Sequence, residues 1–205
     1  MDFKISNIKV YGLNEAVVSS AYPKSVENDL FEDFKGVKES DWKRAEILGT
    51  AKPGSGHDCY LKGVLVQADI TASHAFWIQY LRYHFNDIIS SQSKMHKIQS
   101  FDISSQVNPY VDKDIIRICN GLKAMWLHAR SIGAPKKEID RLFYKLVYNL
   151  PMGFLLTARI NDNYLSLKTQ YQQRKADKLY EWHIYCDWRE SLPKFKSIVL
   201  GKGGS

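Results

Sequence analysis

The chain is poor in cysteine, and its few cysteines are not spaced as metal ligands or redox pairs. Among 205 residues there are three, Cys59, Cys119 and Cys186, an odd number spread far apart. Zinc fingers and dithiol redox sites need close C-x-x-C spacing, which this sequence lacks. We therefore expect reduced thiols in a cytoplasmic protein, with no disulfide framework and no metal site.

Membrane and export signals are also lacking. No apolar run approaches the roughly 18 residues that suggest a membrane-spanning helix. The first ten residues, MDFKISNIKV, have neither a basic segment nor a continuous apolar one, so we expect no signal peptide and no membrane partner. The last five residues, GKGGS (201–205), are expected to be a flexible tail.

No block of like charges interrupts the sequence, so a basic arm for nucleic acid is not indicated. The overall balance is nevertheless basic, because 29 Lys and Arg against 22 Asp and Glu give a net charge of +7. This excess suits an anionic partner, such as a nucleotide, a phosphorylated cofactor or nucleic acid, without choosing among them. Aromatic residues make up 13% of the chain, so we expect an ordered core.

Hydrophobic periodicity predicts an α+β fold. We expect a single domain over residues 1–200, with a small antiparallel or mixed sheet packed against several long helices. Alternating apolar residues predict strands over 3–13, 61–70 and 152–160. Helical spacing predicts helices over 14–22, 71–89, 108–133, 136–150, 162–175 and 176–192. The charged residues 24–55 should form helix fragments and loops.

The second of these predicted helices carries a histidine among apolar residues. Trp77, Leu81, His84 and Ile88 follow one another at spacings of four, three and four, which is one helix face. From spacing alone, His84 is expected to be a hydrogen-bonded core histidine. Zinc would need a second ligand at i+4, and a serine nucleophile would need a G-x-S-x-G frame; neither is present.

A later predicted helix has a polar stripe. Asn163, Ser166, Gln170 and Arg174 follow at spacings of three, four and four. Taken alone, the pattern favours a solvated face, with Arg174 near the negative end of the helix dipole.

Three segments, in order along the chain, resemble the motifs of the flavin-dependent thymidylate synthases. GHDCYLKG (56–63) is similar to G-H-x-S-x-x-E-H and keeps its Gly-His pair. YHFNDIISSQSKMH (83–96) aligns without a gap on R-H-R-x-x-S-x-N-E-x-S-x-R-Y, matching at His84 and Ser93. The third segment (150–174) is similar to the family's Leu-Pro, strand, N-x-R-S-L and L-x-x-R run. Its matching residues are Leu150, Pro151, Asn163, Ser166, Leu167 and Arg174.

The resemblance implies an enzyme that transfers a one-carbon unit from methylenetetrahydrofolate to C5 of the pyrimidine deoxynucleotide dUMP, with FAD and NADPH. It implies a homotetramer with the pocket at a subunit interface. FAD would be bound by His57, His84 and Asn163. Arg174 would be catalytic, holding the pyrimidine and stabilising the charge that develops on its ring. The implied substrate-binding residues are Arg82, Ser91, Gln92, Ser93, Lys94, Ser166 and Arg174.

Four positions depart from the family pattern in the same way. Tyr83, Phe85, Met95 and Leu165 stand where the family has arginine. None of them can make the bidentate, charge-assisted bonds by which arginine binds phosphate, each worth about 1.5–3 kcal/mol. Instead, Tyr83 and Phe85 can stack on a ring, which suggests a changed ligand preference.

Cations close in the sequence, Arg82, Lys94, Lys97 and Lys62, can replace the missing arginines. Arg82 and Lys94 are the better candidates. Three functions stay open. The chain is a divergent thymidylate synthase-like enzyme, an enzyme of the same fold acting on another pyrimidine nucleotide or by other folate chemistry, or a non-catalytic binder of a nucleotide or partner that has lost the flavin site. The absent arginines favour the second and third functions, whereas the retained Asn163, Ser166 and Arg174, together with His84 and Ser93, favour the first two.

Overall fold

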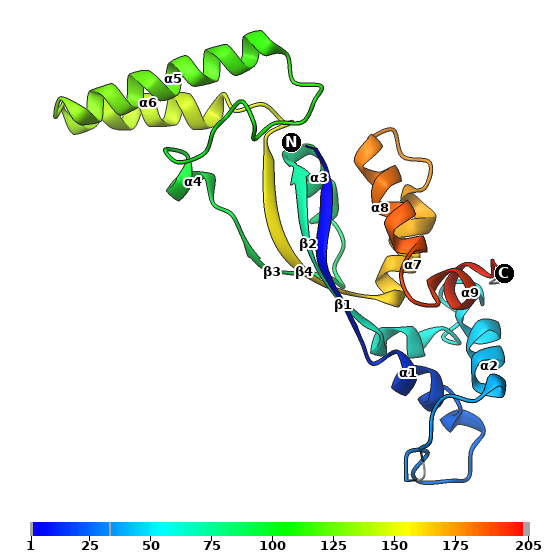
Figure 1. Ribbon diagram of the computed structural model, residues 1–205. Coiled ribbons are helices and arrows are strands. Elements are labelled where there is room, and N and C mark those ends of the chain that lie inside the picture. Colours follow the sequence, from blue (N-terminus) through cyan, green and yellow to red (C-terminus); the bar gives the residue numbers. More distant parts are fainter. Residues whose placement is uncertain (1, 33, 203–205) are drawn as a thin grey trace. The chain divides into compact units, whose positions relative to one another are not determined.

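A computed structural model describes residues 2–32 and 34–202, and within these ranges the fold is α+β as expected (Figure 1). The strands form a sheet in the order β1-β2-β4-β3, with the bounds β1 (Lys4–Tyr11), β2 (Leu65–Ser73), β3 (Asp87–Ser91) and β4 (Leu155–Asn163). The α-helices are α1 (Leu13–Ser19), α2 (Glu39–Gly49), α3 (His74–Tyr80), α4 (Lys94–Lys97), α5 (Lys113–Ser131), α6 (Lys136–Tyr148), α7 (Tyr164–Arg174), α8 (Tyr180–Glu190) and α9 (Phe195–Leu200). The 3-10 helices are η1 (Tyr22–Lys24) and η2 (Cys59–Gly63). Part of the expected tail, residues 203–205, lies outside the described residues.

The chain divides into two compact units. Unit 1 comprises residues 1–4, 70–82 and 90–158, and unit 2 comprises residues 5–69, 83–89 and 159–205. Each strand contributes residues to both units, and each unit is described by itself below. The single domain over residues 1–200 stays a prediction.

Cross-strand pairs define how β2 and β4 run. In unit 2, Arg159 Nη1 lies 3.1 Å from Asp69 Oδ1; in unit 1, the hydroxyls of Thr71 and Thr157 lie 2.7 Å apart. Residue numbers rise along β2 as they fall along β4, so the two strands are antiparallel. Val66, Ala68, Ile70 and Ala72 of β2 are fully buried, and residues along both strands alternate between a buried and a partly exposed face.

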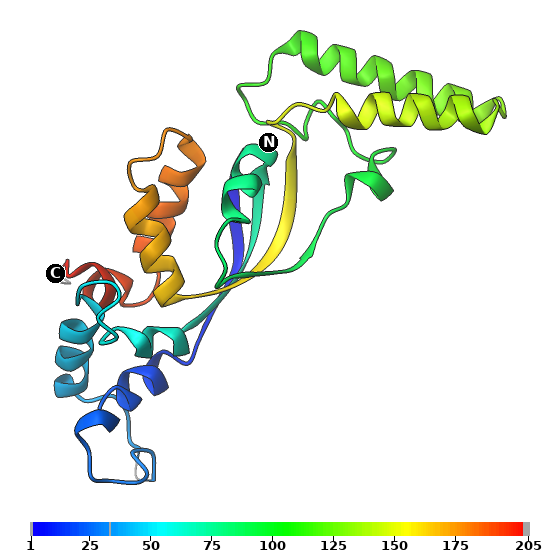
Figure 2. The same cartoon turned by 180° about the vertical axis from the view of Figure 1, so that it is seen from behind.

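In unit 1, α5 and α6 lie side by side as a helical hairpin (Figures 1 and 2). The expected helical spacing is confirmed, but only one side of the stripe packs inward. Leu122 and Trp126 are buried in a core cluster that includes Leu146, whereas Ile118 and Met125 are about half exposed. The wide apolar stripe of α5 therefore exceeds what α6 covers.

The prediction of one helix from residue 71 to 89 is wrong. Helix α3 starts after Ser73, whose hydroxyl accepts the Phe76 N–H at 3.2 Å, and ends at Tyr80. The chain then turns and continues as β3, because the β-branched Ile88 and Ile89 favour an extended backbone beside β4. The spacing patterns also did not predict β3, α4 or α9.

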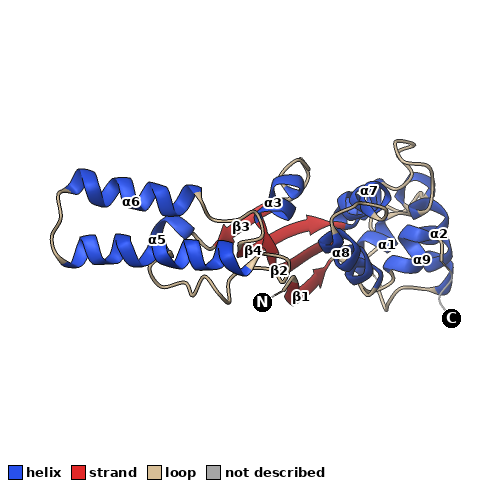
Figure 3. Ribbon diagram, turned by 90° about the horizontal axis from the view of Figure 1, so that it is seen from above, coloured by secondary structure: helices blue, strands red, loops and turns tan. Residues whose placement is uncertain are grey.

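In unit 2, the helices at the C-terminal end of the chain lie beside α2 (Figure 3), and α7 also packs against η2. Their core includes the fully buried Tyr164, Trp182 and Phe195. Gly49, the last residue of α2, permits a close approach to α9, since a Cβ there would lie 2.0 Å from the carbonyl oxygen of Ile198. Among the described residues, no helix combines the length and apolarity needed to cross a bilayer.

Candidate functional site

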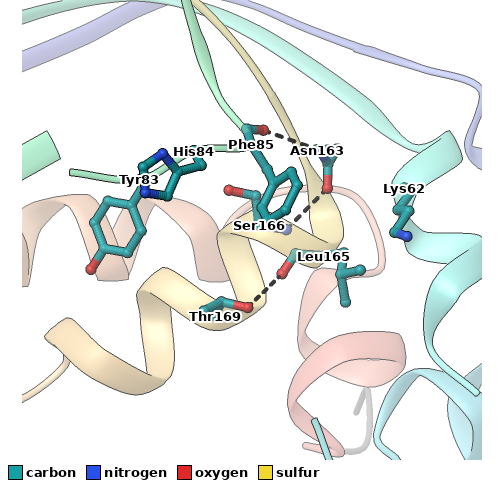
Figure 4. A pocket seen from close by; sticks show the side chains of 8 residues that line it. All are labelled: Lys62, Tyr83, His84, Phe85, Asn163, Leu165, Ser166 and Thr169. Carbon is teal, nitrogen blue, oxygen red and sulfur yellow. Dashed lines mark hydrogen bonds between the residues drawn. The ribbon is translucent and has the colours of Figure 1, made fainter. Parts of the chain in front are cut away.

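A pocket of about 370 Å³ opens within unit 2. Its walls come from three separate segments, namely η2, the turn before β3, and the first turns of α7 (Figure 4). The residues that line it are Lys62, Tyr83, His84, Phe85, Asn163, Leu165, Ser166 and Thr169. The pocket thus brings together three residues expected in the site, His84, Asn163 and Ser166, from positions about 80 residues apart in the sequence.

His84 is not the core histidine that helical spacing favours. It lies in the turn between α3 and β3, and its side chain is exposed at the pocket. Because α3 ends at Tyr80, the face defined by Trp77 does not continue to residue 84. The next residue, Phe85, is 79% exposed and also lines the pocket.

Asn163 starts α7 and joins it to this turn. Its side-chain oxygen accepts the Ser166 N–H at 3.0 Å, the normal bond of an N-terminal helix cap. Its Nδ2 donates to the carbonyl oxygen of Phe85 at 3.4 Å. Both sides of the Asn163 amide are therefore engaged at the edge of the pocket.

The polar stripe of α7 is buried rather than solvated, so that prediction is wrong. Gln170 is fully buried and Ser166 is 7% exposed. Gln170 Nε2 donates to Asp162 Oδ2 at 2.8 Å and to Ser166 Oγ at 3.0 Å. Burial of Ser166 and Gln170 is possible here because they hydrogen-bond each other, the Asn163 cap and Asp162, which is 1% exposed.

A buried arginine completes this network. Arg189 of α8 donates from Nη2 to Gln170 Oε1 at 3.0 Å, and its guanidinium lies 4.0 Å from the ring centroid of Tyr185. Burial raises the pKa of Asp162 to about 6, although bonds from Gln170, Asn163 N–H and Ser166 and the charge of Arg189 oppose the rise. Sequence analysis missed both ionisable residues. The alternation of β4, which buries Ala158 and Ile160, could have identified Asp162.

Arg174 does not line the pocket but contacts a residue that does. Its Nε donates to the Tyr83 hydroxyl at 2.8 Å, and its Nη1 lies 2.6 Å from Asp177 Oδ2. The guanidinium also lies 5.0 Å from the ring centroid of Trp182. Arg174 is thus part of unit 2 beside the pocket, linked to it through Tyr83.

A second buried cation holds the wall formed by η2. Lys168 of α7 donates from Nζ to Asp58 Oδ2 at 2.7 Å and to the carbonyl oxygens of Gly49 and Ala51 at 2.8 Å each. Both charged side chains are almost fully buried. This cluster fixes the chain before η2, which carries the pocket residue Lys62.

The other expected site residues take different places. His57, in unit 2, is exposed and does not line the pocket. The remaining five, Arg82, Ser91, Gln92, Ser93 and Lys94, belong to unit 1.

Two of these five have local roles in unit 1. Gln92 continues the pairing of β3 with β4, since its N–H donates to the Thr157 carbonyl and its side-chain oxygen accepts the Thr157 N–H, both at 2.9 Å. Ser93 is the N-cap of α4. Beside them, burial and the charge of Lys94 lower the pKa of His74 to about 4.

No family model and no curated protein matches the chain. Solved structures do. The chain is similar to thymidylate synthase X (ThyX) from Helicobacter pylori with FAD and dUMP, with 12% identity, a TM-score of 0.65 and 97% coverage of both chains. Another structure of that enzyme with FAD and dUMP gives 14% identity, a TM-score of 0.61 and the same coverage.

A third solved structure is the UMP/dUMP methylase PolB from Streptomyces cacaoi bound with 5-Br dUMP. It shares 12% identity with the chain at a TM-score of 0.66, covering 98% of this chain and 94% of that one. Identities this low establish the architecture and not the activity. The chain therefore has the fold of the flavin-dependent thymidylate synthases and of this related methylase, in a divergent form.

Proposed function

We propose that this protein is a flavin-dependent methyltransferase of the thymidylate synthase type, acting on a pyrimidine deoxynucleotide with dUMP as the first candidate. One observation carries the proposal. His84, Asn163 and Ser166, three residues that match the family motifs, line one pocket in a chain with the family's fold. Two turns far apart in the sequence must converge to form it, which a chance likeness of short motifs would not require.

The residues of the pocket fit a planar ring system. Its volume, about 370 Å³, lies within the usual range for small-molecule sites. The rings of Tyr83 and Phe85 offer stacking surfaces, and Asn163 and Ser166 offer polar groups at the edge.

FAD would be held by His84 and Asn163, with His57 proposed from the resemblance alone. When bound and reduced by NADPH, it would supply the hydride that converts the methylene unit of methylenetetrahydrofolate into the methyl group on C5 of dUMP, as the C5 proton is lost. The chain itself would bind and orient the rings. Arg174 would stabilise negative charge on the pyrimidine, which requires that the ligand replace its bond to Tyr83.

A second candidate is an enzyme of the same fold that acts on another pyrimidine nucleotide. It is favoured because three of the four residues at the family's arginine positions, Tyr83, Phe85 and Leu165, line the pocket. Among the described lining residues, Lys62 is the one with a fixed positive charge. Fewer charged contacts would weaken phosphate binding and change which nucleotide is preferred.

The unit 1 residues Arg82, Ser91, Gln92, Ser93 and Lys94 stay predicted substrate-binding residues, and the homotetramer and the cytoplasmic location stay predictions as well. Gln92 would have to bind substrate without breaking its two bonds to Thr157.

The first experiment asks whether the protein binds flavin. The purified protein is tested for flavin absorbance and then titrated with FAD by calorimetry. We expect a bound flavin or uptake of added FAD. A colourless protein that does not take up FAD would contradict the proposal and leave a non-catalytic nucleotide binder.

The second experiment follows the reaction. Tritium release from 5-tritiated dUMP and from 5-tritiated dCMP is measured with methylenetetrahydrofolate, FAD and NADPH. Release from dUMP supports the first candidate, and release from dCMP alone supports the second. Arg174→Ala should abolish release while circular dichroism stays unchanged, whereas Arg174→Lys should retain part of it because the positive charge remains.

A further inference from the structure

Asp162 lies one residue before the pocket and faces away from solvent. It occupies a buried position of β4 and is 1% exposed, and the following residue, Asn163, is both the cap of α7 and a lining residue. We propose that Asp162 is a positioning residue of the pocket, which orients Asn163 and Ser166 through hydrogen bonds without touching the ligand. The inference rests on the proposed function only in treating this pocket as the ligand site.

Two routes connect Asp162 to the lining residues. Directly, its Oδ1 accepts the Asn163 N–H at 2.8 Å. The Ser166 side chain hydrogen-bonds the same carboxyl, and Gln170 Nε2 links the two groups by donating both to Asp162 Oδ2 and to Ser166 Oγ. Ser166 and Asn163 are in turn joined by the capping bond of α7. The carboxylate thus fixes the cap and the hydroxyl together.

The donors and acceptors allow this network one orientation. A guanidinium only donates, and an ionised carboxylate only accepts. Gln170 lies between the two, so its oxygen must face Arg189 and its nitrogen must face Asp162 and Ser166. The side-chain amide of Gln170 is thereby prevented from flipping, and Ser166 always meets a donor on its buried side.

The charge on Asp162 matters because protonation reverses one of its contacts. The hydrogen of a protonated carboxyl would either meet a group that itself donates, Gln170 Nε2 or Asn163 N–H, or reverse the bond with the Ser166 hydroxyl, which would then accept. Arg189 on α8 is the charged group that acts on this carboxyl, whereas its partners on α7 and β4 are neutral. The elevated pKa of Asp162, about 6, places this change close to neutral pH.

The first test needs no ligand. In ¹H–¹⁵N spectra, Asp162→Asn should shift the signals of the Asn163 side-chain amide and the Ser166 backbone amide. The reason is that the side-chain nitrogen of the new asparagine faces another donor, either Gln170 Nε2 or Asn163 N–H. The double variant Asp162→Asn/Gln170→Glu exchanges donor and acceptor and gives Arg189 a carboxylate, so both signals should return toward their wild-type positions. Unchanged signals in Asp162→Asn, or no return in the double variant, would overturn the proposal.

A control separates positioning from loss of stability. Asp41→Asn removes a carboxylate that caps α2 and pairs with Arg44 outside the network. It should lower thermal stability without moving either signal. If Asp162→Asn does not fold, the wild-type protein is titrated instead, and the Asn163 amide should follow one transition with a midpoint near pH 6. Signals that stay constant from pH 5 to 8 would count against Asp162.

The second test measures ligand binding. In Asp162→Asn, calorimetric affinity for FAD or dUMP should fall roughly tenfold to a hundredfold and recover in the double variant, since one bond to a charged group is lost and then replaced. If wild-type protein binds neither ligand, the proposed function fails while the spectra still decide the role of Asp162. Equal affinity in wild type and Asp162→Asn would refute positioning.

Discussion

The Nε of Arg174 donates to the hydroxyl of Tyr83 at 2.8 Å, and the same guanidinium pairs with Asp177 at 2.6 Å. Tyr83 lines the pocket and Arg174 does not. The arginine that the family resemblance assigns to the pyrimidine is therefore already bonded within the protein, and a ligand must compete with a phenol for it.

Removing that competition should strengthen binding. Tyr83→Phe keeps the ring but deletes the hydroxyl, so Arg174 no longer breaks a hydrogen bond when a pyrimidine arrives. We expect dUMP affinity to rise about two- to tenfold, the worth of one such bond. Calorimetric titration measures it, with Tyr144→Phe on the exposed side of α6 as the control. Weaker dUMP binding in Tyr83→Phe would mean that the bond from Arg174 positions the Tyr83 ring for the ligand, and that Arg174 itself does not bind dUMP.

Restoring a family arginine should add a charged contact. Leu165 lines the pocket at the family's N-x-R-S arginine position, so Leu165→Arg should bind dUMP about tenfold more tightly. The gain should shrink as salt rises, because the new contact is ionic. Titrations at low and high salt measure it. Ile47→Arg, at a position of α2 that is 73% exposed, adds the same charge outside the pocket. An equal gain in both variants would indicate general electrostatic attraction.

The buried ion pair beside η2 should dominate local stability. Lys168→Met leaves Asp58 buried without its cation, which typically costs about 3–5 kcal/mol of unfolding free energy. Urea denaturation measures the loss, and Asp58→Asn/Lys168→Met should regain part of it because no charge is then stranded. Lys136→Met breaks an exposed pair and should leave stability unchanged. A loss no larger in Lys168→Met than in Lys136→Met would show that water reaches Asp58.

The raised pKa of Asp162 also predicts a pH dependence of stability. An unfolded aspartate titrates near 3.8 and the folded one near 6, so its stabilising contribution is complete below pH 3.8 and is lost as the pH rises through 6. Asparagine does not titrate. The unfolding free energy of wild type relative to Asp162→Asn should therefore fall by about 2 kcal/mol from pH 4.5 to 7.5. Denaturation across this range measures it; a constant difference would mean that the carboxyl titrates normally.

Strand patterns were the most reliable guide to the fold. In β2, alternation alone predicted the buried positions Val66, Ala68 and Ile70, because a strand with one buried face repeats every two residues. The helical pattern from Trp77 failed because Ile88 and Ile89 fit either period, and pairing with β4 decided between them.

Three residues of the candidate site could be selected from the sequence, but the surface they form could not, and the roles of the site residues stay a prediction. Motif likeness selected His84, Asn163 and Ser166, which do share a pocket. It did not indicate that Gln170 is buried, since a polar stripe has the same spacing whether water or Arg189 satisfies it. Burial of that kind depends on a helix ten or more residues further along the chain, which no local pattern contains.

The ammonium of Lys168, enclosed by three protein oxygens, also bears on how fast a ligand can bind. Because it joins α7 to the chain leading into η2, both walls of the cavity keep their spacing before any ligand arrives. Little conformational entropy then remains to be lost on complex formation. Association should proceed in a single kinetic phase whose rate is linear in ligand concentration, without a slow rearrangement that sets a plateau.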